Sequence, residues 1–133
     1  MSARANLKVW HDHFANKDGT GLADQIADDA AVHSPVAPRP QSGKPPVVAY
    51  LSAADVVLAN DGFRYGREIV DESQNMAMLE FELELDGIQV NGVDIISWND
   101  DGKIQDFKVM VRPLKAINKV WEEMGKMLEK MKG

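Results

Sequence analysis

The stretch NMAMLEFELELDGIQVNGVDIISW, residues 75–98, decides the fold of this chain. Apolar residues alternate with methionines and glutamates through its first half, so alanine, leucine and phenylalanine share one face of a strand. The dipeptide Asp86-Gly87 then interrupts the pattern and is typical of a two-residue hairpin turn. The stretch therefore predicts two antiparallel strands joined by a tight turn.

The same two-residue period continues on both sides of this hairpin. Residues 63–73 alternate before it, and residues 103–113 alternate after a second turn signal at residues 99–102. These segments extend the hairpin to a meander of four antiparallel strands. The chain before the meander and after it changes to a helical period.

Helices are predicted around the meander. Apolar residues at helical spacing predict helices over residues 3–16 and 21–31, a third that starts with Ser42 as its cap and is ended by residues 60–62, and a fourth over residues 115–132. A short strand is predicted over residues 31–36, between the second and third helices. Helices kept apart from an antiparallel meander indicate an α+β fold.

Composition excludes several classes of function. The chain of 133 residues has a net charge of −6 and no block of basic residues, so neither nucleic acid nor an anionic membrane surface is an expected partner. It has no cysteine, which removes disulfides, thiolate catalysis and cysteine metal sites. No apolar run follows the N-terminus, and none reaches the length of a membrane span. We expect a cytoplasmic protein without a signal peptide.

Three local signatures in this order resemble a known superfamily. They are ADDAAVHSPV with PQSG at residues 27–43, NGVDIISWNDDGKI at residues 91–104, and DFKVMVRPL at residues 106–114. The chain resembles the nuclear transport factor 2-like superfamily in its SnoaL-like, ketosteroid-isomerase-like branch. The resemblance implies one SnoaL-like domain over residues 1–133. Its implied fold is a cone-shaped, curved antiparallel sheet with N-terminal helices covering a pocket, plus a C-terminal helix.

The resemblance also implies where catalytic groups would lie. Ketosteroid isomerases of this branch use an aspartate base, a tyrosine on the first helix and a protonated aspartate on a strand. These positions fall on Ser34, Trp10 and Asp94. The aspartate that cyclases and epoxide hydrolases of the superfamily carry on the last strand falls on Val109. One position of three matches, so a faithful ketosteroid isomerase is disfavoured.

Two residues are candidate catalytic groups, Asp94 and His33. If Asp94 faces an apolar cavity, desolvation raises its pKa, and the neutral acid can donate a hydrogen bond to a carbonyl. The alternative is a structural carboxylate bonded to Trp10 or to the backbone. His33 is a natural base near neutral pH, provided that the strand turns it inward. The alignment instead favours a Ser34 side chain that points into the cavity. The alternatives are that Ser34 hydrogen-bonds to the backbone and that His33 packs at an interface.

The candidate ligand-binding residues are large or polar side chains on the expected cavity walls. They are Trp10, Phe14, Ser34, Tyr50, Trp98 and Phe107. No cofactor and no metal are expected. His11 and His13 point about 200° apart on a helix and cannot share one ion.

The outer face of the meander carries glutamates, basic residues and exposed methionines. We expect it to form a homodimer, the alternative being a solvated charged face. The expected ligand is a small apolar organic molecule. The sequence leaves open whether the pocket performs an isomerase-type or cyclase-type proton transfer, binds without turnover, or belongs to a dimeric assembly protein.

Overall fold

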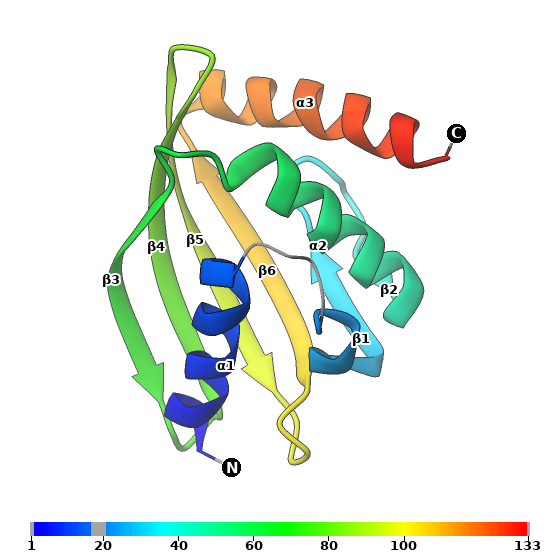
Figure 1. Cartoon of the computed structure of the whole chain (residues 1–133), viewed down its shortest axis with the longest axis vertical. Coiled ribbons are helices and arrows are strands. Elements are labelled where there is room, and N and C mark those ends of the chain that lie inside the picture. The colour runs from blue at the N-terminus through cyan, green and yellow to red at the C-terminus, as the bar shows by residue number, and fades with distance from the viewer. Residues whose placement is uncertain (1, 17–20, 133) are drawn as a thin grey trace.

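A computed structural model describes residues 2–16 and 21–132 of the chain (Figure 1). Its elements, in chain order, are α1 (Ala3–Asn16), a short 3-10 helix η1 (Ala23–Gln25), β1 (Ile26–His33), β2 (Gln41–Ser42), α2 (Lys44–Leu58), β3 (Arg64–Asp71), β4 (Met76–Leu85), β5 (Ile88–Trp98), β6 (Ile104–Arg112) and α3 (Leu114–Lys132). Among the described helices, none is long and apolar enough to cross a membrane.

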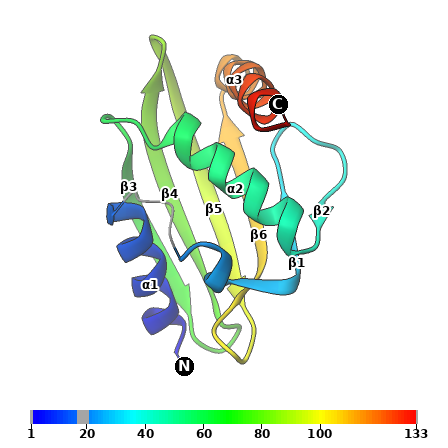
Figure 2. The same cartoon turned by 45° about the vertical axis from the view of Figure 1, so that its right-hand side comes forward.

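The six strands form one curved sheet in the order β2-β1-β6-β5-β4-β3. Neighbouring strands are antiparallel except for β1 and β6, which run parallel. Figures 1 and 2 show α1 and α2 lying over the same face of the sheet, with α3 across the end at which β6 finishes. The α+β fold with helices covering one face of a curved sheet is confirmed.

The core lies between this inner sheet face and the helices. On β4, the side chains predicted to point inward are all buried: Ala77, Leu79, Phe81, Leu83 and Leu85. Each buried side chain of leucine size contributes about 1.5–3 kcal/mol of hydrophobic stabilisation. The hairpin turn is also confirmed, because Asp86 and Gly87 have φ angles of 51° and 84°, as a tight turn of the primed type requires.

The segment predicted as a helix over residues 21–31 is instead mostly strand. Leu22, Ile26 and Ala30 follow one another at intervals of four residues and are all buried, which is also the spacing of a helix face. In the structure, β1 pairs with β6, and its register shifts between Ile26 and Ala31. This irregularity turns two consecutive aspartates to the solvent, and so the strand acquires a helix-like spacing of apolar residues.

Two boundaries also differ from the prediction. The short strand expected at residues 31–36 begins earlier, at Ile26, and ends at His33. Ser42 belongs to β2 and does not cap α2; the capping residue is Gly43, with a φ angle of 98° and no side-chain cap bond. Pro45 and Pro46 occupy the first turn of α2, where a missing amide donor is tolerated.

Candidate functional site

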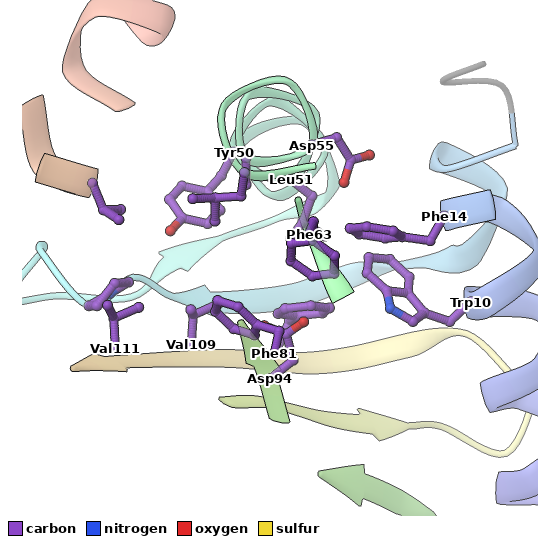
Figure 3. Close-up of a pocket in the computed structure, with 15 residues that line it drawn as sticks. Trp10, Phe14, Tyr50, Leu51, Asp55, Phe63, Phe81, Asp94, Val109 and Val111 are labelled. Carbon is purple, nitrogen blue, oxygen red and sulfur yellow. The ribbon is translucent and has the colours of Figure 1, made fainter. Parts of the chain in front are cut away.

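A small pocket lies between α1, α2 and the inner face of the sheet, and its volume is about 30 Å³. Figure 3 shows Tyr50, Leu51 and Asp55 reaching it from α2, Trp10 and Phe14 from α1, and Asp94 and Val109 from the sheet. The complete lining is Trp10, Phe14, Pro35, Tyr50, Leu51, Ala54, Asp55, Leu58, Phe63, Phe81, Asp94, Phe107, Val109, Val111 and Val120. Two carboxylates therefore face an otherwise mostly apolar space.

Asp94 is held by a chain of hydrogen bonds that crosses three elements. Its side chain comes from β5, and the residue is only 7% exposed. The Tyr65 hydroxyl on β3 donates to Asp94 Oδ2 over 2.9 Å. Trp10 Nε1 on α1 in turn donates to the Tyr65 hydroxyl over 3.1 Å. Trp10 thus acts on Asp94 through Tyr65.

Burial raises the pKa of Asp94 to about 7. The hydrogen bond from Tyr65 lowers this pKa, and the negative charge of Asp55 raises it. Because Oδ2 accepts from Tyr65, the proton of the neutral acid resides on Oδ1. Near neutral pH the neutral carboxylic acid, which can donate a hydrogen bond, is therefore present beside the ionised form.

Asp55 is held by His13, a residue of α1 that is 7% exposed. His13 Nε2 lies 3.2 Å from Asp55 Oδ2. Burial raises the pKa of Asp55, while the hydrogen bond and the charge of His13 lower it. His13 Nδ1 is buried and has no hydrogen-bond partner among the described residues.

Four of the expected ligand-binding residues line the pocket: Trp10, Phe14, Tyr50 and Phe107. Trp98 is buried at the end of β5 and lies outside the lining. Ser34 also lies outside it. Its Oγ accepts a hydrogen bond from the Val36 amide over 3.2 Å.

His33 lies on the outer side of the sheet. In the parallel pairing of β1 with β6, Val32 is opposite the pocket residue Phe107, and His33 is opposite Lys108. Successive side chains of a strand point to opposite faces, so His33 points away from the pocket. Its Nε2 bonds to Asp106 Oδ1 over 2.8 Å. The condition under which His33 would serve as the base, an inward side chain, is not met.

Comparison with known proteins identifies the family. The model of the SnoaL-like domain matches residues 7–107. The chain belongs to the SnoaL-like family. No curated protein matches it.

Solved structures resemble this SnoaL-like domain over most of its length. A steroid delta-isomerase from Pseudomonas aeruginosa is 35% identical, with a TM-score of 0.90 over 97% of this chain and 93% of that one. An uncharacterized protein with a cystatin-like fold from Silicibacter pomeroyi is 28% identical, with a TM-score of 0.80 over 91% and 83% of the two chains. The expected superfamily is therefore confirmed.

Three polar residues of the site in this SnoaL-like domain were not predicted from the sequence. Asp55 follows Leu51 by four residues on α2, so it shares the helix face assigned to the cavity. His13 follows Trp10 by three residues on α1, and Tyr65 follows Phe63 by two on the third strand of the chain. All three positions lie on faces that the periodic patterns predict to be buried. Only the apolar residues on those faces were predicted to line the cavity.

A groove adjoins the pocket on the side of β3. It is lined by His11, Phe14, Ala59, Asn60, Phe63, Arg64 and Tyr65, and its volume is about 370 Å³. Phe14 and Phe63 line both spaces, and their ring centroids are 4.9 Å apart. These two rings therefore form the wall between the pocket and the groove.

Within residues 2–16 and 21–132, no three histidine or acidic side chains gather in a way that could hold a metal ion. The polar groups that face the pocket are instead suited to hydrogen bonding and proton transfer.

Proposed function

We propose that this SnoaL-like domain binds a small apolar carbonyl compound in the pocket and moves a proton at the carbon beside that carbonyl. The observation that carries the proposal is Asp94, a carboxyl group with a pKa of about 7 on the wall of an apolar pocket. The similarity to a steroid delta-isomerase at 35% identity supports an isomerase-type reaction.

Asp94 would act as the hydrogen-bond donor to the carbonyl oxygen. Removal of a neighbouring proton places negative charge on that oxygen, and a donor fixed in a dry site stabilises this charge more than it stabilises the neutral ketone. Tyr65 fixes the donor by occupying Asp94 Oδ2. The Tyr50 hydroxyl is a second donor in the lining, and burial raises its pKa.

The ligand must enlarge the pocket. A volume of about 30 Å³ accepts little more than water, whereas ligand pockets usually measure about 300–1,000 Å³. Displacement of Phe14 and Phe63 would join the pocket to the groove of about 370 Å³. We therefore place the route of entry at these two rings.

The test uses a series of cyclic β,γ-unsaturated ketones, from one ring to a four-ring 5-ene-3-ketosteroid. Isomerisation to the conjugated ketone raises the ultraviolet absorbance. We expect conversion of at least one member, and a loss of about 100-fold or more with Asp94→Ala, because removal of one oxyanion donor has this effect. Asp106→Ala, on the other sheet face, is the matched control. No conversion above buffer for any member would overturn the proposal.

Binding without turnover is the second candidate. The observation that favours it is the lack of a base where relatives carry one, since that position is Ser34 and His33 faces the other side of the sheet. Quenching of tryptophan fluorescence by a ketone that the wild-type protein does not convert would support this candidate. The same assay can compare ligands. Stronger quenching by flexible polyketones than by rigid cyclic ketones would favour a cyclase-type ligand.

We propose in addition that a second copy of the chain covers the outer sheet face. We define the outer groove there by Arg67, Ile69, Met78, Glu80, Asn91, Gly92, Val93, Met110, Val111 and Arg112; its volume is about 430 Å³. Ile69 and Met110 are more than half exposed. The groove holds both positive and negative side chains, so two copies related by a two-fold axis can pair unlike charges.

A further inference from the structure

Two carboxylates reach the pocket from opposite sides. In Figure 3, Asp94 lies on the sheet side and Asp55 projects from α2, with the Phe14 and Phe63 rings between them in this view. Asp94 has been assigned the role of donor, and the reaction still lacks a base. We propose that Asp55 is the general base of this pocket and that His13 positions it. This inference rests on the proposed proton transfer and names the residue that carries it out.

The contact with His13 uses one carboxylate oxygen of Asp55 and leaves the other oxygen to accept a proton. His13 Nε2 faces a carboxylate oxygen, so Nε2 carries the proton and donates to Asp55 Oδ2 over 3.2 Å. His13 Nδ1 is buried without a hydrogen-bond partner in the described part of the chain, so the ring holds Asp55 through Nε2. Among the described residues, the hydrogen bond to Asp55 engages Oδ2, and Oδ1 stays available to accept a proton.

His13 cannot easily move away from this position. Its side chain is 4% exposed, and its ring centroid lies 5.7 Å from that of Trp10. Trp10 is itself almost fully buried and is tied to Tyr65. The two carboxylates are thus oriented by one helix: α1 holds Asp55 through His13, and it holds Asp94 through Trp10 and Tyr65.

The environments of the two carboxylates separate their roles. The negative charge of Asp55 raises the pKa of both Asp94 and Tyr65, which places Asp55 within electrostatic reach of the donor. Burial raises the pKa of both carboxyl groups, and a hydrogen bond lowers each, from Tyr65 to Asp94 and from His13 to Asp55; only Asp55 also has the charge of His13 beside it, which lowers its pKa further. Two carboxyl groups with different surroundings in one site divide into a proton donor and a proton acceptor.

The proton transfer balances without any further reagent. Asp55 Oδ1 takes a proton from the carbon between the carbonyl and the double bond. The electron pair of that C–H bond forms a double bond to the carbonyl carbon, and the π pair of the carbonyl moves to its oxygen. The resulting dienolate oxygen accepts a hydrogen bond from Asp94 Oδ1. Asp55 then returns its proton to the far carbon of the former double bond. The product is the conjugated ketone, and both carboxyl groups end as they began.

The main test replaces Asp55 by asparagine. The asparagine side-chain oxygen can still accept a hydrogen bond from His13, so the fold keeps this contact while the basic carboxylate is lost. Removal of a general base lowers the rate typically 10²–10⁴-fold, and we expect kcat for ketone isomerisation to fall by about 100-fold or more. Unchanged kcat would overturn the assignment of Asp55.

A second variant keeps the test decisive if the first does not fold. Asp55→Ala leaves a space beside His13, and added formate should restore part of the lost rate by acting as a free base. The matched control is Asp106→Ala, because Asp106 is also bonded to a histidine but lies on the outer sheet face. Formate should not change its rate. A loss with Asp55→Ala that formate cannot reverse would assign Asp55 a structural role and overturn the proposal.

His13 is tested as a positioning residue. His13→Gln retains an N–H donor for Asp55, whereas His13→Leu removes it. We therefore expect a higher kcat for the glutamine variant than for the leucine variant. KM should change little in both variants. Equal kcat in the two variants would contradict the positioning role. Failure of the wild-type protein to convert any ketone would instead overturn the proposed function itself, which distinguishes the two failures.

Discussion

A carboxyl group as deeply buried as Asp94 loses the water that would stabilise its charge, and its neutral form is favoured. Among the described residues, Tyr65 on β3 and Asp55 on α2 act on its pKa, and its own charge raises the pKa of Tyr50 on α2. Tyr65 offers it a hydrogen bond, but burial still dominates and holds its pKa at about 7. The residue suited to donate a proton is therefore also one that weakens the fold when it ionises.

This linkage predicts how stability changes with pH. The unfolded chain releases the Asp94 proton near pH 3.8, and the folded protein keeps it until about pH 7. Stability consequently falls as pH rises through this window, by up to about 4 kcal/mol from this group. We expect Asp94→Asn to gain stability relative to wild type between about pH 4 and pH 8, as measured by urea unfolding. A difference that does not vary with pH would contradict this expectation.

Single residues of the site were predictable where one strand or helix determines their position. The resemblance to the ketosteroid-isomerase-like branch pointed to Asp94 and Trp10, and the helix period placed Tyr50 on the buried side of its helix. The bonds that give Asp94 and Asp55 their properties join residues 29 and 42 positions apart in the chain. No local pattern contains such contacts, so the roles of Tyr65 and His13 became visible only in three dimensions.

At the scale of elements, the long alternating strands were predictable and β1 was not. In β4 and β5 the period of two runs without interruption over ten residues or more. In β1 the register shift interrupts the period of two after the first two residues. The buried apolar residues then recur every four residues, which is the spacing of a helix. The partner of β1 is the distant strand β6, so the information that fixes it as a strand lies almost eighty residues further on.

Gly92 shows how closely β5 is packed against its neighbours. A Cβ atom at this position would lie 2.6 Å from the Met110 carbonyl oxygen and would clash with the Phe81 ring. Gly92→Ala should therefore destabilise the protein by about 1–3 kcal/mol, as overpacking of a core does. Thermal unfolding measures the effect, with a lower Tm expected.

Gly125 on α3 supplies the control for this prediction. An added Cβ there meets nothing within 4 Å, and alanine is favoured over glycine in a helix interior. Gly125→Ala should raise stability by about 0.5–1 kcal/mol. If Gly92→Ala left Tm unchanged or raised it as Gly125→Ala does, the packing argument for Gly92 would be wrong.

At the scale of the whole molecule, the outer groove predicts self-association. Met110→Glu places a charge among its apolar side chains and should convert a dimer to a monomer in sedimentation velocity experiments. Val56→Glu is the control, because Val56 is 65% exposed on α2, away from the outer groove. A wild-type protein that stays monomeric at high micromolar concentration would exclude the dimer.

The buried carboxyl of Asp94 has one further consequence, which concerns the solution around the protein. In the proposed reaction a neutral carbonyl ligand would accept its hydrogen bond from the protonated form, so binding above about pH 7 would draw a proton from the buffer. Apparent affinity then declines about tenfold for each pH unit beyond that point. The heat of binding likewise includes the ionisation enthalpy of whichever buffer supplies the proton. Ligand screens at alkaline pH would therefore underrate this pocket, and mildly acidic conditions are where its ligands should first be sought.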